Sequence, residues 1–193
     1  LLGYRDNFSI YDTQDQIALL RESAAESNSP LEPGEATRIL ARYSAAKTGR
    51  QSWDELPAAY LDLYSTYSEH LRLYNAVDFD DLIRLPIRLF EQNPEILAAY
   101  QERFRYLMVD EFQDTSADQY ELLRMLASAH RNVAVVGDDD QSIYSWRGAN
   151  YDNFLLFEKD FPDYLEVKLE QNYRSTDKIL AAANGVGENN RNR

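Results

Sequence analysis

Two adjacent carboxylates, Asp110 and Glu111, follow a short apolar run and have the residue types and spacing to do chemistry. The run, residues 106–109, is typical of a buried strand, and ligands of open α/β sheets bind beyond the carboxyl ends of the strands. One acid there can hold a hydrated Mg²⁺ ion, and the other can orient and deprotonate an attacking water. The pair therefore indicates magnesium-nucleotide chemistry, although an acidic loop that binds nothing accounts for two such residues equally well.

Two more strand candidates lead directly into polar clusters. Residues 132–136 precede Gly-Asp-Asp-Asp-Gln-Ser-Ile-Tyr-Ser-Trp-Arg-Gly, and residues 165–169 precede Glu-Gln-Asn-Tyr-Arg-Ser. Three strands that end in polar clusters predict three loops at one edge of a sheet. The aspartates at 138–140 could be read as metal ligands, but they are interpreted mostly as carboxylates of a turn or of the outer surroundings of the metal, because Asp110 would supply the expected magnesium contact.

The blocks at residues 109–115, 135–149 and 169–175 resemble motifs II, III and IV of superfamily 1 DNA helicases. The branch is that of the bacterial Rep, UvrD and PcrA helicases, and within it the chain is expected to resemble Rep more than the other two. The resemblance extends through residues 78–82 and 7–10 and covers most of the chain. It implies an α/β fold in which a helical subdomain, similar to subdomain 1B, precedes part of a RecA-like P-loop NTPase sheet.

The resemblance also implies roles for single residues in ATP hydrolysis. Asp110 would hold Mg²⁺, and Glu111 would polarise the water that attacks the γ-phosphate of ATP. Gln141 would sense that phosphate, since an amide can donate to a phosphate oxygen and accept from water. Arg174 would be an arginine finger that also binds the nucleotide, and Tyr173 would stack on the adenine.

A DNA-binding role is implied for the end of the second polar cluster. Trp146 would stack on a base of single-stranded DNA, with Tyr144 and Arg147 beside it. Stacking suits a protein that moves over any sequence, because every base has a π-face and contributes about 1–3 kcal/mol. The alternative is a tryptophan in the core, but the polar residues around it and Gly148 favour an exposed loop.

The first part of the chain, residues 1–104, is predicted to be helical. Asp12 can cap a helix that runs to Glu26, and a second helix should end at Gly49. The Ser-x-x-Glu pattern at residues 52–55 predicts a capping box at the start of a long third helix. That helix carries one stripe at steps of four and three residues, formed by Tyr60, Tyr64, Tyr67, Leu71 and Tyr74. The stripe favours a core face over a platform for base stacking, because stacking platforms usually have cations beside them.

The acidic run at residues 78–81 has two interpretations, a metal site or a helix N-terminus. The helix N-terminus is favoured, because carboxylates in a first turn accept from the free N–H groups and oppose the dipole. Pro86 should then kink or divide that helix, and Asn93-Pro94 should begin another. The inward face of this last helix is predicted to comprise Ile96, Leu97, Tyr100 and Phe104.

The pattern changes near residue 105 to strand, helix and strand, which predicts a parallel pair joined by a right-handed crossover. We therefore expect a helical subdomain at 1–104, the second half of a RecA-like ATPase subdomain at 105–174, and a helix leading into the next subdomain at 175–193. The sequence nowhere contains G-x-x-x-x-G-K-[ST], the loop that cradles phosphates. We expect the chain to be an internal piece of a helicase that needs its remaining subdomains and is inactive alone.

Charge and composition limit the possible partners. The net charge of -13 counts against a nucleic-acid partner, but basic residues are more frequent in residues 172–193. The chain has no cysteine, and no apolar run approaches the roughly 18 residues that span a bilayer, so a cytoplasmic protein without membrane contact is expected.

The function implied by the resemblance is an ATP- and Mg²⁺-dependent helicase that moves 3′ to 5′ on single-stranded DNA. It would unwind 3′-tailed duplex DNA in replication or repair. Two alternatives remain open. One is the helicase part of a helicase-nuclease similar to AddAB or RecB, and the other is a DNA-binding or interaction module without catalysis.

Overall fold

The computed structural model describes residues 2–144, 148–150 and 152–187. Helices joined to short parallel strands confirm the predicted α/β fold class. The chain divides into two compact units, which are described separately. The helical unit is Leu1–Arg105 with Ala117–His130, and the sheet unit is Tyr106–Ser116 with Arg131–Arg193.

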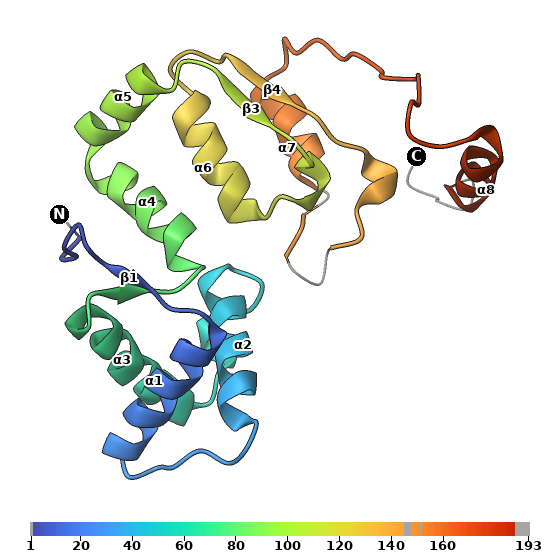
Figure 1. Cartoon of the computed structure of the whole chain (residues 1–193). Coiled ribbons are helices and arrows are strands. Elements are labelled where there is room, and N and C mark those ends of the chain that lie inside the picture. Colours follow the sequence, from blue (N-terminus) through green and yellow to red (C-terminus); the bar gives the residue numbers. More distant parts are fainter. Residues whose placement is uncertain (1, 145–147, 151, 188–193) are drawn as a thin grey trace. The chain divides into compact units, whose positions relative to one another are not determined.

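Six α-helices, one 3-10 turn and two short strands make up the described part of the helical unit (Figure 1). The elements in chain order are β1 (Ser9–Ile10), α1 (Thr13–Glu26), α2 (Glu35–Lys47), η1 (Trp53–Glu55), α3 (Ala58–Leu73), β2 (Ala76–Val77), α4 (Asp81–Gln92), α5 (Pro94–Arg103) and α6 (Ala117–Ala127). Helix α1 packs against both α2 and α3, and α4 packs against both α5 and α6.

The first two helices begin and end where local signals predict. Asp12 accepts hydrogen bonds from the N–H groups of Gln14 and Asp15, at 2.7 and 3.0 Å, and the Asp15 carboxylate accepts from the N–H of Asp12. This capping box satisfies backbone donors that have no partner within the helix. At the C-terminal end of α2, Gly49 has a φ of 71°, a conformation that glycine adopts without strain.

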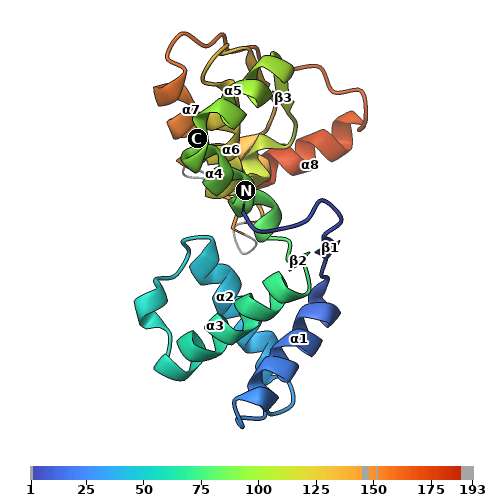
Figure 2. The same cartoon turned by 90° about the vertical axis from the view of Figure 1, so that its left-hand side faces the viewer.

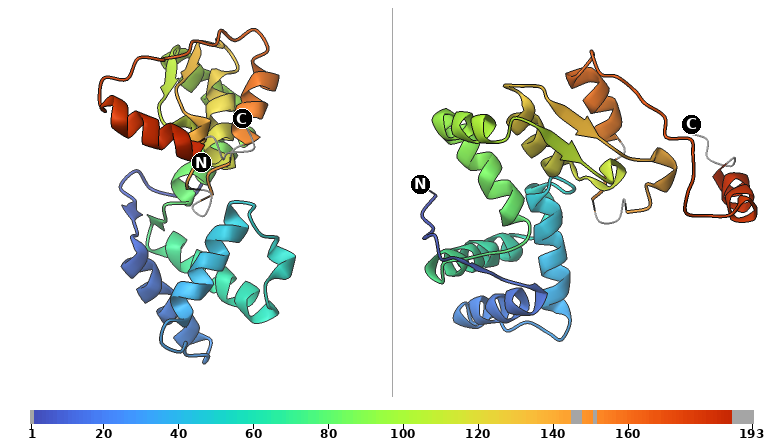
Figure 3. Two further views of the ribbon diagram at one scale, coloured as in Figure 1. Left: turned by 90° about the vertical axis from the view of Figure 1, so that its right-hand side faces the viewer. Right: turned by 45° about the horizontal axis from the view of Figure 1, so that its top comes forward.

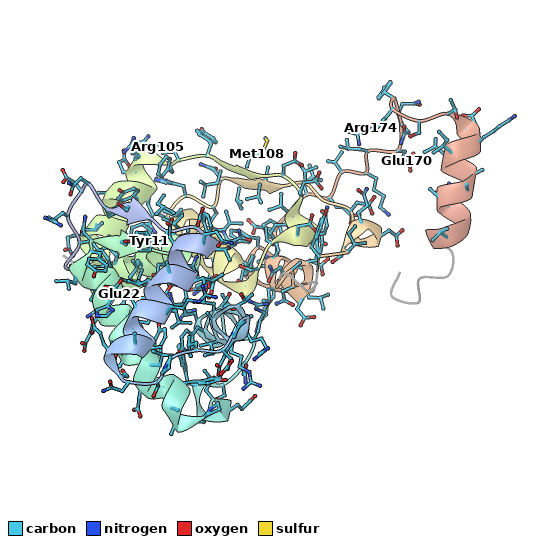
Figure 4. The ribbon with its side chains drawn as sticks, turned by 60° about the horizontal axis from the view of Figure 1, so that its bottom comes forward. Tyr11, Glu22, Arg105, Met108, Glu170 and Arg174 are labelled. Carbon is cyan, nitrogen blue, oxygen red and sulfur yellow. The ribbon has the colours of Figure 1, made fainter. Side chains whose placement is uncertain are left out.

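The stripe on α3 forms part of the core, as predicted. Tyr67 and Leu71 are buried, and Tyr60 and Tyr64 pack half-buried against the same cluster. Tyr74 is the exception, because it lies just beyond α3, is exposed, and donates to Glu22 at 2.6 Å. Glu22 projects from the surface of α1 (Figure 4). The stripe therefore stabilises the helical unit through burial and provides no exposed row of rings for base stacking.

The capping box predicted at residues 52–55 is wrong. Ser52 accepts from the N–H of Asp54 and begins only a 3-10 turn, Trp53–Glu55. Helix α3 starts later, after Pro57, since proline has no N–H to donate and its fixed φ suits a helix start.

The predictions for α4 and α5 are confirmed in part. Asp78 accepts from the N–H of Asp81 at 3.0 Å, so the acidic run does begin a helix. Pro86 does not divide α4, whose residues Ile87 and Phe90 are buried beyond it. Pro94 begins α5. Two residues of the predicted inward face, Tyr100 and Phe104, are each 40% exposed, because they sit in the last turn and at the C-cap.

Residues 1–104 are not wholly helical, which corrects the prediction. Strands β1 and β2 pair in parallel with Ser9 opposite Ala76 and Ile10 opposite Val77. The Ser9 N–H donates to Asn75 O, and the Tyr11 N–H donates to Val77 O, both at 2.9 Å. Figure 2 shows these strands beside α1 and α3. Two-residue strands leave no periodic signal in a sequence, which explains why they were missed.

The sheet unit contains a parallel pair of strands, β3 (Leu107–Val109) and β4 (Val133–Val135) (Figure 3). The register places Leu107 opposite Val133 and Val109 opposite Val135. The pair confirms two predicted strands, although each is shorter than its apolar run. The first is half-buried and not fully buried, since Tyr106 and Met108 expose most of their side chains. Met108 is labelled in Figure 4.

The remaining described elements of the sheet unit are helices and turns. They are the 3-10 turns η2 (Phe112–Asp114) and η3 (Asp139–Gln141), and the helices α7 (Asp152–Asp160) and α8 (Asp177–Gly187). Helix α8 agrees with a helix predicted from residue 175, whereas α7 was not predicted.

The third predicted strand, residues 165–169, is wrong. Its apolar side chains Leu165, Val167 and Leu169 are 86%, 68% and 82% exposed, and the segment has no regular structure. Alternating apolar residues favour a strand only where a neighbouring strand accepts the hydrogen bonds, and the described chain provides none at this segment.

Among the helices that the structure describes, none is long and apolar enough to cross a membrane.

Candidate functional site

The parallel pairing of β3 and β4 brings two of the three predicted loops to the same sheet edge. The Val136 N–H donates to Val109 O at 2.8 Å, and the Phe112 N–H donates to Val136 O at 2.9 Å. The ladder therefore continues past both strands into the loops that follow. Asp110 and Glu111 emerge beside residues 137–141, as the rule for the carboxyl ends of strands predicts.

Glu111 has an unusual backbone conformation, with φ 51° and ψ 44° in the left-handed region. For a residue with a side chain, such a conformation costs about 1–3 kcal/mol and persists only where the surroundings enforce it. Its N–H donates to Asp110 Oδ1 at 2.9 Å. The next residue, Phe112, is fully buried, with its ring 5.1 Å from that of Phe154 and 5.7 Å from that of Phe157. These contacts hold the two carboxylates in a defined turn.

A buried glutamine joins the two loops. Gln113 is 2% exposed, and its Nε2 donates to Glu111 Oε2 at 2.6 Å while its Oε1 accepts from the N–H of Asp138 at 3.1 Å. Gly137 lies against it, since a Cβ there would be 2.7 Å from Gln113 Oε1. Sequence reasoning missed Gln113, although it stands within the block at 109–115. Its only signal was a polar residue between apolar or acidic neighbours.

The loop after β4 is organised by Asp138, as expected of a turn carboxylate. Its Oδ1 accepts from the N–H of Asp140 at 3.0 Å, and its Oδ2 accepts from Gln141 Nε2 at 2.7 Å. The Gln141 N–H donates to Asp138 O. The Gln141 side chain is exposed, and its amide is held by Asp138 in the same turn.

A cavity of about 470 Å³ lies between the two loops of the sheet unit. It is lined by Glu111, Gln113, Asp114, Asp140, Gln141, Ile143 and Tyr144. The structure therefore brings together three of the predicted site residues: Glu111, Gln141 and Tyr144. Asp110 is not a lining residue, but its exposed carboxylate contacts the backbone of Glu111 at the mouth of the turn.

The third block contributes nothing to this cavity within the described residues. Asn172 Oδ1 accepts from the N–H groups of Arg174 and Ser175, both at 2.9 Å, in a turn before α8. Arg174 is exposed on this segment (Figure 4), and Tyr173 is 92% exposed. Trp146 and Arg147, the predicted DNA contacts, lie outside the described residues.

The cavity is lined by acids, which determines what it can bind. Glu111, Asp114 and Asp140 contribute carboxylates, and Asp114 Oδ1 is buried without a hydrogen-bond partner in the described chain. A cation is favoured there and a bare triphosphate is repelled, because like charges repel strongly where water is partly excluded. Any nucleotide at this site therefore needs cations from elsewhere to hold its phosphates.

The donor set at the end of β3 is suitable for Mg²⁺ in one respect. Mg²⁺ keeps several waters and is held by one or two carboxylates together with substrate phosphates. Asp110 offers one exposed carboxylate of this kind. No group of three or more metal-binding side chains occurs among the residues with described positions, so a closed metal cage formed by protein ligands alone is not found there.

Comparison with known proteins gives a consistent result over the whole chain. The family profile of the UvrD/REP helicase N-terminal domain matches residues 1–162. The chain is 44% identical to the ATP-dependent DNA helicase PcrA of Bacillus subtilis (strain 168), in an alignment that covers 100% of this chain and 27% of that protein. It is 43% identical to the ATP-dependent DNA helicase Rep of Escherichia coli (strain K12), over 98% of this chain and 29% of the relative.

These identities do not separate a PcrA-like from a Rep-like chain, so the predicted preference for Rep is not supported. The chain spans less than a third of the length of these curated relatives. The profile match covers most of the sequence, including both loops that form the cavity. The chain therefore belongs to the UvrD/REP helicase family and contains residues of its N-terminal domain.

Proposed function

We propose that this chain is part of an ATP-dependent DNA helicase that couples ATP hydrolysis to translocation on single-stranded DNA and to duplex unwinding. The observation that carries the proposal is the position of Glu111, in a strained turn beside Asp110 and facing a cavity that it shares with Gln141. Family membership and relatives that are named ATP-dependent DNA helicases support it. Replication or repair of DNA is the process in which such an activity would be used.

The two carboxylates would divide the chemistry. Asp110 would hold Mg²⁺, which when bound neutralises charge on the phosphates. Glu111 would take a proton from the attacking water. Its Oε2 already accepts a hydrogen bond from Gln113, so Oε1 is the atom assigned to the proton. A base is effective only within hydrogen-bond reach of the proton that it abstracts, and the fixed turn limits where Glu111 can reach.

Other residues of the chain would bind nucleotide and DNA. Gln141 would contact the γ-phosphate, while Arg174 and Tyr173 would reach the phosphoryl group and the adenine. The exposure of Tyr173 and Arg174 leaves both side chains available for a ligand. Tyr144 would contact single-stranded DNA at the rim of the cavity, together with Trp146 and Arg147. Movement is proposed to run 3′ to 5′, with 3′-tailed duplexes as substrates.

The rest of the protein would complete the site. We assign residues 1–104 to a subdomain similar to 1B, residues 105–174 to the second half of a RecA-like subdomain, and residues 175–193 to a helix that leads into the next. The sequence contains no phosphate-cradling loop, and the cavity is acidic. The isolated 193-residue chain is therefore expected to show no ATP turnover, with or without single-stranded DNA. DNA-stimulated turnover by this chain would contradict the assignment.

The test of the proposed function uses the full-length protein. Glu111→Gln keeps the shape of the side chain but cannot accept the proton, so kcat should fall by about 10²–10⁴-fold. Nucleotide binding, measured with a fluorescent ATP analogue, should persist. The exposed Glu95 on α5 provides the control, because Glu95→Gln changes the same charge away from the site. Near wild-type turnover in Glu111→Gln would show that Glu111 is not the base.

A further inference from the structure

We propose that Gln113 is a positioning residue that fixes the carboxylate of Glu111 and couples it mechanically to the loop at residues 137–141. The proposal rests on the proposed function, because it assigns Glu111 the role of the base. It concerns a buried side chain whose amide is hydrogen-bonded at both ends to groups of the protein itself. Gln113 acts through the hydrogen bonds at the two ends of its amide.

The Gln113 amide forms a hydrogen bond at each end and so bridges the two loops. Gln113 is buried, and its amide connects the Glu111 carboxylate with the Asp138 backbone through bonds of 2.6 and 3.1 Å. The two ends belong to loops that leave different strands. A buried amide that uses both its donor and its acceptor is costly to leave unpaired, so neither bond is easily given up.

The orientation of the amide follows from its partners. The N–H of Asp138 can only donate, and the carboxylate of Glu111 accepts. The oxygen of Gln113 must therefore face Asp138 and its nitrogen must face Glu111, because the reversed amide would oppose like groups at both ends. The carboxylate of Glu111 is thus held by a donor on one oxygen, which leaves the other to face a water.

Close packing against Gly137 restricts movement of the Gln113 amide. At Gly137 a Cβ would lie 2.7 Å from Gln113 Oε1 and 3.1 Å from the ring of Phe154, so the backbone of residue 137 presses directly on the amide. Asp138 in turn holds Gln141 through a bond of 2.7 Å. A shift of Gln141 is therefore transmitted through Asp138 to Gln113 and on to Glu111. This chain of contacts is a physical connection between a phosphate sensor and a base.

Two substitutions in the full-length protein separate positioning from bulk packing. Gln113→Met fills a similar volume but forms neither hydrogen bond, and a displacement of about 1 Å at a reacting group can cost about a hundredfold in rate. We therefore expect kcat for DNA-stimulated ATP hydrolysis to fall by about that factor. The KM for ATP should change far less, since both ends of the Gln113 amide are already hydrogen-bonded within the protein.

Gln113→Glu is a second substitution that tests the interaction with the base. It keeps an oxygen that can accept from Asp138, but it places a second carboxylate against Glu111. A carboxylate at position 113 cannot donate to Glu111 and repels it, so it should displace the Glu111 carboxylate from the position that the amide holds. The kcat of Gln113→Glu should therefore fall at least as far as that of Gln113→Met, while the KM for ATP changes far less. A purely structural role for Gln113 would lower stability without separating kcat from KM in this way.

Gln101→Met is the matched control. Gln101 in the helical unit also uses its amide nitrogen, which donates to Met125 O at 2.8 Å and Ser128 Oγ at 2.9 Å. Its loss should lower the melting temperature and leave both kcat and the KM for ATP unchanged. The proposal is overturned if folded Gln113→Glu or folded Gln113→Met keeps wild-type kcat. Absence of ATP turnover in the wild-type protein would instead refute the proposed function, so the two failures are distinguishable.

Discussion

The ammonium group of Lys47, at the end of α2, lies 2.6 Å from Asp78 Oδ2, and both side chains are buried. The same nitrogen contacts Asp81 Oδ1 at 2.8 Å. Burial alone would lower the pKa of Lys47, but the two carboxylates outweigh it and raise the pKa above the ordinary value of 10.5. The acidic run at 78–81 therefore pairs with a lysine of its own unit, which accounts for it without a metal ion.

Lys47→Met should destabilise the chain strongly. Removing the cation leaves Asp78 buried and Asp81 half-buried without it, and breaking a buried pair costs about 3–5 kcal/mol. Urea unfolding followed by circular dichroism measures the loss. Lys159→Met, at an exposed position of α7, is the control and should change little. Equal midpoints for the two variants would refute a stabilising role for the buried pair.

The contribution of Lys47 should also depend on pH. Its folded pKa is raised above the unfolded value of 10.5, so its stabilisation is fully present below pH 10.5 and is lost as the pH rises through the folded pKa. The difference in unfolding free energy between wild type and Lys47→Met should thus stay constant from neutral pH to about pH 9.5, one unit below that value, and shrink above 10.5. A difference that declined between pH 6 and 9 would contradict this assignment.

Two buried tyrosines should respond in opposite directions to loss of their hydroxyl groups. Tyr67 Oη is buried and has no hydrogen-bond partner in the part of the chain that is described, whereas Tyr43 Oη donates to Tyr60 O at 2.6 Å. Tyr67→Phe should raise the unfolding free energy by about 1 kcal/mol, and Tyr43→Phe should lower it by about 1 kcal/mol. Thermal melts of both variants measure the shifts. Loss of stability in Tyr67→Phe would indicate that the hydroxyl has a partner.

Asn153 of α7 should be essential for the turn that carries the acids. It is fully buried and donates to Thr115 O at 2.9 Å and Thr115 Oγ1 at 3.0 Å. Asn153→Leu removes both bonds, at a cost of about 1 kcal/mol for each, while Thr115 O keeps its bond from the Asn150 N–H at 3.0 Å. Amide hydrogen exchange of residues 112–116 should accelerate. Asn93→Leu, which removes a comparable bond to Leu89 O in the helical unit, should not affect that segment; unchanged exchange in Asn153→Leu would contradict the prediction.

Gln141 should transmit nucleotide state to DNA affinity in the full-length protein. Gln141→Ala is expected to bind single-stranded DNA nearly as wild type does, but to lose the change in affinity caused by a non-hydrolysable ATP analogue. Trp146→Ala should weaken DNA binding itself by up to about 3 kcal/mol. Fluorescence anisotropy with and without the analogue measures both effects. A full nucleotide-dependent change in Gln141→Ala would show that this loop is not the connection.

Local signals in the sequence predicted much of the helical unit. The cap at Asp12, the stop at Gly49 and the start at Pro94 depend on residues within one turn, and all three are confirmed. Pairing partners are not local. Residues 165–169 have the composition of a strand but no described neighbour, and β1 and β2 form only because Ser9 and Ala76 meet.

The candidate site was also predictable only in part. The rule that loops gather at the carboxyl edge of parallel strands placed Glu111, Gln141 and Tyr144 at one cavity. The residues that hold this site were not predictable. Gln113 bonds to a backbone group 25 residues away and Asn153 to one 38 residues away, and no spacing rule identifies partners of that kind.

The pairing of β1 with β2 brings together the two ends of the segment that lies between them in the sequence. The segment that contains α1, α2 and α3 leaves the strand pair after Ile10 and returns at Ala76, so its two ends are neighbours, and most of its buried residues form a cluster of their own. A segment whose ends are adjacent and whose buried residues pack mainly with one another can be lengthened, exchanged or deleted with little disturbance to the residues on either side. This part of the chain is therefore where relatives can diversify by insertion while the strands that flank it stay in register.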